Sequence, residues 1–137
     1  FVVQRNGGGG QANFWHLLSA TNTVAVVGSG TPTDVIVPGD YDGDGKTDIA
    51  TVRGSGGVIN WFYRSSANSS ITQVAFGASA TDFPAQGDYD GDGRTDFGVW
   101  RPGTPGAFWA MSSASLAVSA FQLGSTGDYP VANYNSH

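Results

Sequence analysis

The chain contains two nearly identical acidic loops. Residues 39–48 read GDYDGDGKTD, and the segment returns at residues 87–96 as GDYDGDGRTD, a shift of 48 positions. Each copy places carboxylates at loop positions 1, 3, 5 and 9 and glycines at positions 4 and 6, a set of hard oxygen ligands of the kind that Ca²⁺ prefers. A fixed period of this length indicates a repeat architecture. The sequence therefore predicts a repeat protein with two cation-binding loops.

The acidic residues belong to the repeat rather than to a general charged surface. All 11 are Asp, and eight of them lie in the two loops. The other three, Asp34, Asp82 and Asp128, begin similar segments at matching places in successive units. Two divalent ions would bring the formal net charge from -5 to about -1, so the acidity indicates cation sites. Six scattered Lys and Arg residues do not favour nucleic-acid binding.

Short strands account for the rest of each unit. An apolar run ends in Arg5, Arg53 or Arg101, a Gly-rich turn and an aromatic strand follow, and a Ser/Thr-flanked run then ends in Gly. Four short strands per unit, with frequent turn signals and no helical period, are typical of a β-propeller blade. We therefore predict an all-β, β-propeller-type array of about three four-stranded antiparallel blades, with units at 1–47, 48–95 and 96–137.

These features resemble the FG-GAP (VCBS) repeats of integrin α-subunit propellers, some fungal lectins and many secreted bacterial proteins. The resemblance rests on the two Asp-x-Asp-x-Asp-Gly-x-x-Asp loops, the strands that end in Arg and the aromatic strands, and it covers nearly the whole chain. It implies that each loop joins the first two strands of a blade and binds calcium. The implied ligands are Asp40, Asp42, Asp44, the Lys46 carbonyl and Asp48, and then Asp88, Asp90, Asp92, the Arg94 carbonyl and Asp96.

The acidic loops have other interpretations. Asp and Gly also suit Asx turns that bind no metal, although four carboxylates in nine residues would repel one another. An EF-hand needs Glu at loop position 12, where Thr51 and Val99 stand, and the chain has no Glu. Magnesium prefers to keep several waters, so calcium fits a ligand-rich loop better. We expect the ion to stabilise the fold rather than to catalyse a reaction.

The repeat is offset along the chain. Phe1 matches Ile49, so the first unit begins on the second strand of a blade, just after a metal loop. Residues 133–137 resemble the first strand and the opening of another loop, with Asn133 and Asn135 where the loop has Asp. We expect the C-terminal strand to complete the first blade of another copy, giving head-to-tail self-association into a ring or a filament. A processed product, or a fragment of a longer propeller scaffold, is the other expectation.

The aromatic strands offer a possible ligand site. Trp15, Trp61 and Trp109 are assigned to equivalent positions of the three units. They either pack between blades or form repeated sugar-stacking platforms, since indole faces suit the apolar faces of sugar rings. A lectin-like protein that binds glycans is therefore an alternative to a structural, adhesive protein that binds itself or another surface protein.

Catalysis and membrane insertion are not expected. The chain has no Cys and no independent Ser/His/Asp set, and His16 lies within an aromatic strand. No apolar run approaches the 18 residues of a membrane span. Calcium loops of this type often need the calcium levels found outside cells, so we expect a secreted or cell-surface protein.

Overall fold

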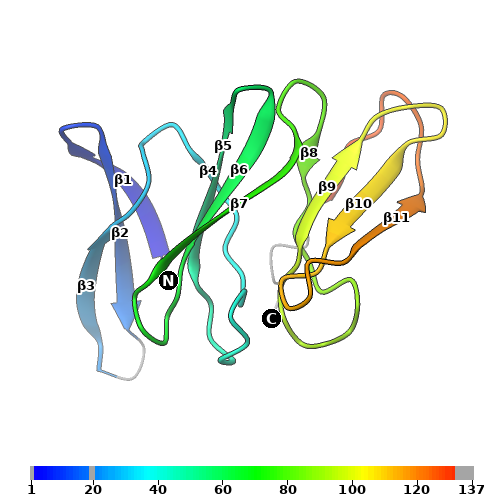
Figure 1. Cartoon of the computed structure of the whole chain (residues 1–137). Coiled ribbons are helices and arrows are strands. Elements are labelled where there is room, and N and C mark those ends of the chain that lie inside the picture. Colours follow the sequence, from blue (N-terminus) through cyan, green and yellow to red (C-terminus); the bar gives the residue numbers. More distant parts are fainter. Residues whose placement is uncertain (1, 19–20, 132–137) are drawn as a thin grey trace. The chain divides into compact units, whose positions relative to one another are not determined.

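The computed structural model describes residues 2–18 and 21–131, which form three antiparallel β-sheets and contain no helix (Figure 1). The all-β prediction is confirmed over these residues. The described part of the chain also holds no membrane-spanning helix. The strands are β1 (Val2–Gly8), β2 (Gln11–Leu18), β3 (Thr23–Gly28), β4 (Val35–Ile36), β5 (Ile49–Ser55), β6 (Val58–Arg64), β7 (Ile71–Ala78), β8 (Phe83–Pro84), β9 (Phe97–Arg101), β10 (Ala107–Met111) and β11 (Val118–Gln122).

The chain divides into two compact units, Phe1–Val35 and Ile36–His137. The first unit carries a three-stranded sheet of order β1-β2-β3. The second carries the strands of two four-stranded sheets, of orders β4-β5-β6-β7 and β8-β9-β10-β11, with β4 at the boundary. Each four-stranded sheet thus starts with a two-residue strand that precedes an acidic loop, and the loop leads into the second strand.

Two of the three sheets have the four strands that the sequence predicts. The described residues place only three strands in the first sheet. The segment 128–131, which repeats the sequence pattern of β8, is described but is not part of a strand. Residues 133–137, predicted as a first strand, lie outside the described residues.

Strand pairing shows which positions are equivalent between the sheets. Arg5, Arg53 and Arg101 are 48 residues apart, and we use them as equivalent positions of the three sheets. Each arginine pairs with a residue of the following strand: Arg5 with Asn13, Arg53 with Asn60, and Arg101 with Ala107. The connection between these partners spans eight, seven and six positions in turn. The first hairpin has a β-bulge between Asn6 and Gly8 that the second lacks, and both turn over two glycines. In the third sheet a loop of residues 102–106 joins β9 directly to β10.

The predicted equivalence of the three tryptophans is therefore wrong. The register aligns Trp15 with Phe62 and Trp109, whereas Trp61 aligns with Phe14 and Phe108. Because successive side chains of a strand point to opposite faces, a shift of one residue places Trp61 on the other face of its sheet. Trp61 is 1% exposed, and its Nε1 donates to the Phe76 carbonyl at 2.9 Å.

The core of the second unit lies between its two sheets. Val52, Ile59 and Trp61 from the β4–β7 sheet belong to one buried cluster with Phe97 and Val99 of β9. The ring of Phe97 packs edge-on against Trp61, with centroids 5.7 Å apart. Tyr41, from the first acidic loop, stacks on Phe97 at 5.3 Å. The core thus fixes the start of the first loop against the neighbouring sheet.

Candidate metal sites in the two acidic loops

Each acidic loop is closed by its own backbone. The amide of Asp48 donates to the Gly39 carbonyl at 2.7 Å, and the amide of Asp96 donates to the Gly87 carbonyl at 2.8 Å. Inside the first loop, the two carboxylate oxygens of Asp40 accept bonds from the amides of Gly43 and Gly45. Both glycines have positive φ, 76° and 80°, which glycine adopts without steric cost. These glycines let the loop wrap around its first carboxylate.

The last carboxylate of each loop is buried. Asp48 is 1% exposed and accepts bonds from the amides of Tyr41, at 2.9 Å, and Ser66, at 2.7 Å. Burial raises the pKa of Asp48 above its ordinary value, although both amide bonds act in the opposite direction. Without a cation, the stability that this group contributes is present at low pH and is lost as the pH rises through the raised pKa. A bound cation would compensate for the buried charge.

The second loop repeats this arrangement. Asp96 is also 1% exposed and accepts bonds from the amides of Tyr89, at 2.9 Å, and Ser113, at 3.0 Å. Burial raises the pKa of Asp96 as well. Asp88 accepts bonds from the amides of Gly91 and Gly93. The two loops therefore share one hydrogen-bonding plan as well as one sequence.

Three carboxylates converge in each loop. Asp40, Asp42 and Asp48 offer oxygens that all lie within 4.8 Å of one another, and so do Asp88, Asp90 and Asp96. This spacing allows both groups to hold a metal ion, and ligands made only of oxygen suit a hard cation. The described residues thus bring together six of the eight carboxylates that the resemblance implied as ligands.

The other implied ligands lie outside these groups. Asp44 accepts bonds from the Lys46 amide at 2.8 Å and from the Ser66 hydroxyl at 2.7 Å. Asp92 accepts a bond from the Arg94 amide at 2.8 Å. Ligation by Asp44 and Asp92, and by the carbonyls of Lys46 and Arg94, stays a prediction.

A pair of serines supports the first loop, and the sequence analysis missed it. Ser65 and Ser66 follow β6, and their hydroxyls donate to Asp42 and Asp44, respectively. The Ser66 amide also holds Asp48, so one turn contacts three loop carboxylates. The signal is visible in the sequence, because Ser-Ser-Ala follows the aromatic strand at residues 65–67 and again at 112–114.

The two loops contact each other directly. The Thr95 amide donates to the Asp40 carbonyl at 2.6 Å, and the Asp40 amide donates to the Thr95 hydroxyl at 3.0 Å. Gly39 faces this threonine so closely that an added Cβ would lie 2.5 Å from its side chain. The start of the first loop is therefore fixed by the end of the second loop.

An arginine–aromatic pair recurs in all three sheets. The guanidinium carbon lies 5.2–5.8 Å from the ring centroid in the pairs Arg5–Trp15, Arg53–Phe62 and Arg101–Trp109. Arg101 also forms a bidentate pair with Asp82, with both N–O distances 2.7 Å. Burial opposes ionisation of Asp82, but the bonds from Arg101 and from the Ala78 amide prevail and lower its pKa. Each arginine thus contacts an aromatic ring of the following strand, and Arg101 also binds the Asp82 carboxylate.

Replacing Arg101 with Met is expected to destabilise the protein by about 2 kcal/mol at pH 7, because the buried Asp82 carboxylate loses charged donors. The loss should shrink as the pH falls below the ordinary carboxyl pKa of 3.8, because the stability supplied by a lowered pKa disappears once the group is protonated. Urea unfolding of both proteins at pH 7 and pH 3 measures this difference. An equal loss at both pH values would show that the charge of Asp82 is not involved.

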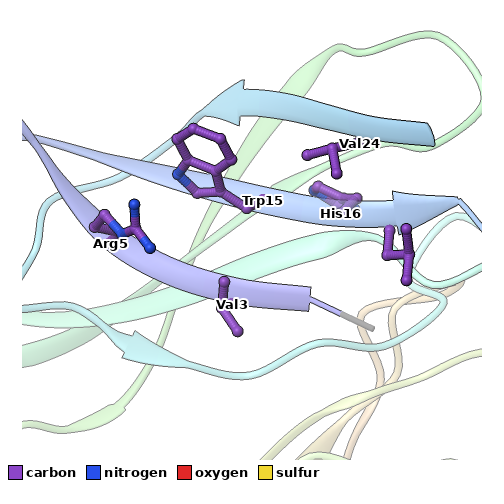
Figure 2. A pocket seen from close by; sticks show the side chains of 6 residues that line it. Val3, Arg5, Trp15, His16 and Val24 are labelled. Atoms are coloured by element: carbon purple, nitrogen blue, oxygen red, sulfur yellow. The ribbon is translucent and has the colours of Figure 1, made fainter.

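The predicted tryptophan site is only partly available. Trp61 is buried and cannot contact a ligand. Trp15 lines a hollow of about 240 Å³ with Val3, Arg5, His16, Leu17 and Val24, and Figure 2 shows its indole beside the Arg5 guanidinium. The buried Nε1 of Trp15 has no hydrogen-bond partner among the described atoms. A repeated platform of three tryptophans is therefore absent from the described residues, and Trp15 and Trp109 remain as candidates.

The repeated sheets and acidic loops define an all-β repeat protein with two candidate metal sites. Residues 40–99, which run from the first acidic loop to β9, match the family model of the FG-GAP-like repeat. This part of the chain is therefore an FG-GAP-type repeat, and the resemblance seen in the sequence is confirmed there. No curated protein and no solved structure matches the chain.

Proposed function

We propose that this chain is a calcium-stabilised, β-propeller-type structural module that acts outside the cell. The observation that carries the proposal is the convergence of three carboxylates in each of two loops, both of which lie within the residues that match the FG-GAP-like repeat. Calcium accepts six to eight oxygen ligands in flexible geometry, which suits loops that offer carboxylates and backbone carbonyls. Repeats of this family are typically extracellular, which supports a secreted or cell-surface location.

The bound ions would act on the fold. Asp40, Asp42 and Asp48 would hold one ion, and Asp88, Asp90 and Asp96 would hold the other. An ion at either place supplies positive charge that removes repulsion between the loop carboxylates. The first loop is bonded to the serine turn after β6, through Ser65 and Asp42, and to the second loop, through Asp40 and Thr95. An ion that fixes the first loop would therefore also stabilise both sheets of the second unit. The proposal assigns no catalysis to the chain.

We further propose that copies associate head to tail by strand completion, as a structural or adhesive assembly. In the four-stranded sheets, β4 and β8 lie beside β5 and β9, whereas among the described strands β1 has only β2 as a neighbour. Residues 128–131, DYPV, repeat the pattern of residues 82–85, DFPA, which contain β8. A segment of this kind from another copy would add a fourth strand beside β1 by β-augmentation.

The register of β8 specifies the proposed contact. Phe83 pairs with Trp100, and Asp82 binds Arg101 through both guanidinium bonds. The same register would pair Tyr129 with Gln4 and would bring Asp128 to Arg5 of the neighbouring copy. Tyr129 is 74% exposed, so it is available for this contact. A rotation that closes would give a ring, and one that does not close would give a filament.

Exchanging the charges of Arg5 and Asp128 tests strand completion. Arg5→Asp alone and Asp128→Arg alone should each lower the particle mass measured by light scattering, because each places like charges together at the contact. The double variant should recover assembly, because the pair is restored with the charges reversed. A wild-type protein that stays at the 14.1 kDa of one chain in calcium would contradict the assembly.

Carbohydrate binding is the second candidate function. The hollow beside Trp15 favours it, because apolar side chains line this hollow beside an indole, and sugar rings have apolar faces that suit such a surface. A saturable change of tryptophan fluorescence on titration with monosaccharides, lost in Trp15→Ala, would support this function. The FG-GAP match is also compatible with a third role, as a scaffold segment of a longer propeller.

A further inference from the structure

The two sheets of the second unit show how one sheet covers the next. The β4–β7 sheet presents Val52, Trp61 and Val74 on one face, which we call the donor face. The β9–β10 hairpin presents Phe97, Val99 and Met111 on one face, which we call the acceptor face. By the register of the arginines, this face is opposite to the one that corresponds to the donor face. All of these residues belong to the same core cluster or pack against it. Within the second unit, a donor face therefore packs on an acceptor face.

The first sheet carries an acceptor face whose residues are exposed. By the register of the arginines, Val3 and Leu17 occupy the positions of Val99 and Met111. Val99 is 1% exposed under the neighbouring donor face, whereas Val3 is 57% exposed. Both Val3 and Leu17 line the hollow around Trp15, and Val3 is labelled in Figure 2. Within the first unit, the described residues do not cover this apolar face.

The last sheet carries the matching donor face. Trp100, Phe108 and Phe121 occupy the positions of Val52, Trp61 and Val74. Val74 is partly buried against the core, whereas Phe121 is 50% exposed. Leu123, at the position of the packed Phe76, is 66% exposed. Phe121 and Leu123 on this face therefore remain in contact with solvent, whereas Trp100 is buried.

We infer that the donor face of the β8–β11 sheet of one copy packs on the acceptor face of the β1–β3 sheet of a second copy. The chain itself supplies the precedent, because equivalent positions make this contact between the two sheets of the second unit. The contact is between two different surfaces, so each copy can bind one neighbour on each side. This inference rests on the proposed head-to-tail association. It adds a contact between two sheet faces to the proposed pairing of residues 128–131 with β1.

Two lysine variants test the face contact. Leu17→Lys blocks the acceptor face, and Phe121→Lys blocks the donor face; both side chains are already partly exposed, so the substitutions should leave each chain folded. Each variant alone should be a monomer by light scattering, because one of its two surfaces is blocked. An equimolar mixture should form dimers of twice the 14.1 kDa chain mass, because one intact junction remains.

The controls separate this inference from strand completion. Leu116→Lys adds the same charge at an exposed leucine outside both faces and should assemble like the wild type. The face contact would be overturned if both lysine variants assemble like the wild type. If the particle mass still responds to the exchange of Arg5 and Asp128, strand completion would stand without it. A monomeric wild-type protein would overturn both. Circular dichroism checks that each variant is folded. If a lysine variant unfolds, Leu17→Ser or Phe121→Ser replaces it, and the same outcomes are expected.

Discussion

Removing calcium with an excess of chelator is expected to lower the free energy of unfolding by about 5 kcal/mol, if calcium was present at about 100 times its dissociation constant at both sites. Each site contributes about 2.7 kcal/mol at that concentration, because only the folded loops bring their carboxylates together. Thermal and urea unfolding in calcium and in chelator measure the difference. The expected sign follows from linkage, because the ion binds the folded loops and not the unfolded chain, and it would neutralise the buried carboxylates of Asp48 and Asp96.

Variants of the loops identify the source of this effect. Asp40→Ala combined with Asp88→Ala removes one carboxylate from each converging group and should make unfolding insensitive to calcium. Asp34→Ala is the matched control, because it removes a carboxylate outside both loops and outside the proposed contact between copies, and the difference between calcium and chelator should be kept in full. Equal melting of the wild-type protein in calcium and in chelator would contradict a structural role for the ion.

Replacing Trp61 with Ala is expected to destabilise the protein by about 3–5 kcal/mol, because the change opens a cavity in a packed core. The matched change, Trp109→Ala, should cost about 1 kcal/mol, since that side chain is 37% exposed and contributes mainly its contact with Arg101. Urea unfolding of the two variants gives the comparison. Similar losses would mean that the two residues occupy equivalent places, as their spacing from the preceding arginine suggests.

The sequence predicted the repeat and its acidic loops well, because these are encoded locally. Loop positions 1, 3 and 9 are the carboxylates that converge, and the intervening glycines take the positive φ values that the loop needs. The strand that precedes each loop was also recognisable from its Asp-aromatic-Pro or Asp-Val-Ile segment. In these places a few neighbouring residues determine the local structure.

Contacts between distant residues were harder to predict. The serines that hold the first loop lie 18–23 positions from their carboxylate partners, and the Thr95–Asp40 contact spans 55 positions. Nothing local in the sequence specifies such partners, although the repeated Ser-Ser-Ala segment was a usable signal. The face of Trp61 was assigned wrongly for a related reason: side-chain direction depends on strand register, and register depends on the bulges and loops between the paired strands.

The connection between the arginine strand and the aromatic strand has a consequence for how such repeats can be exchanged. A hairpin moved as a whole, from its arginine through its aromatic strand, carries its own bulge and turn and keeps each aromatic residue on its native face. A crossover inside this connection would join parts of connections that differ in length, and a change of one residue would turn the side chains of the following strand to the other face. Exchange of an intact hairpin therefore preserves which side chains are buried, whereas exchange within the connection does not.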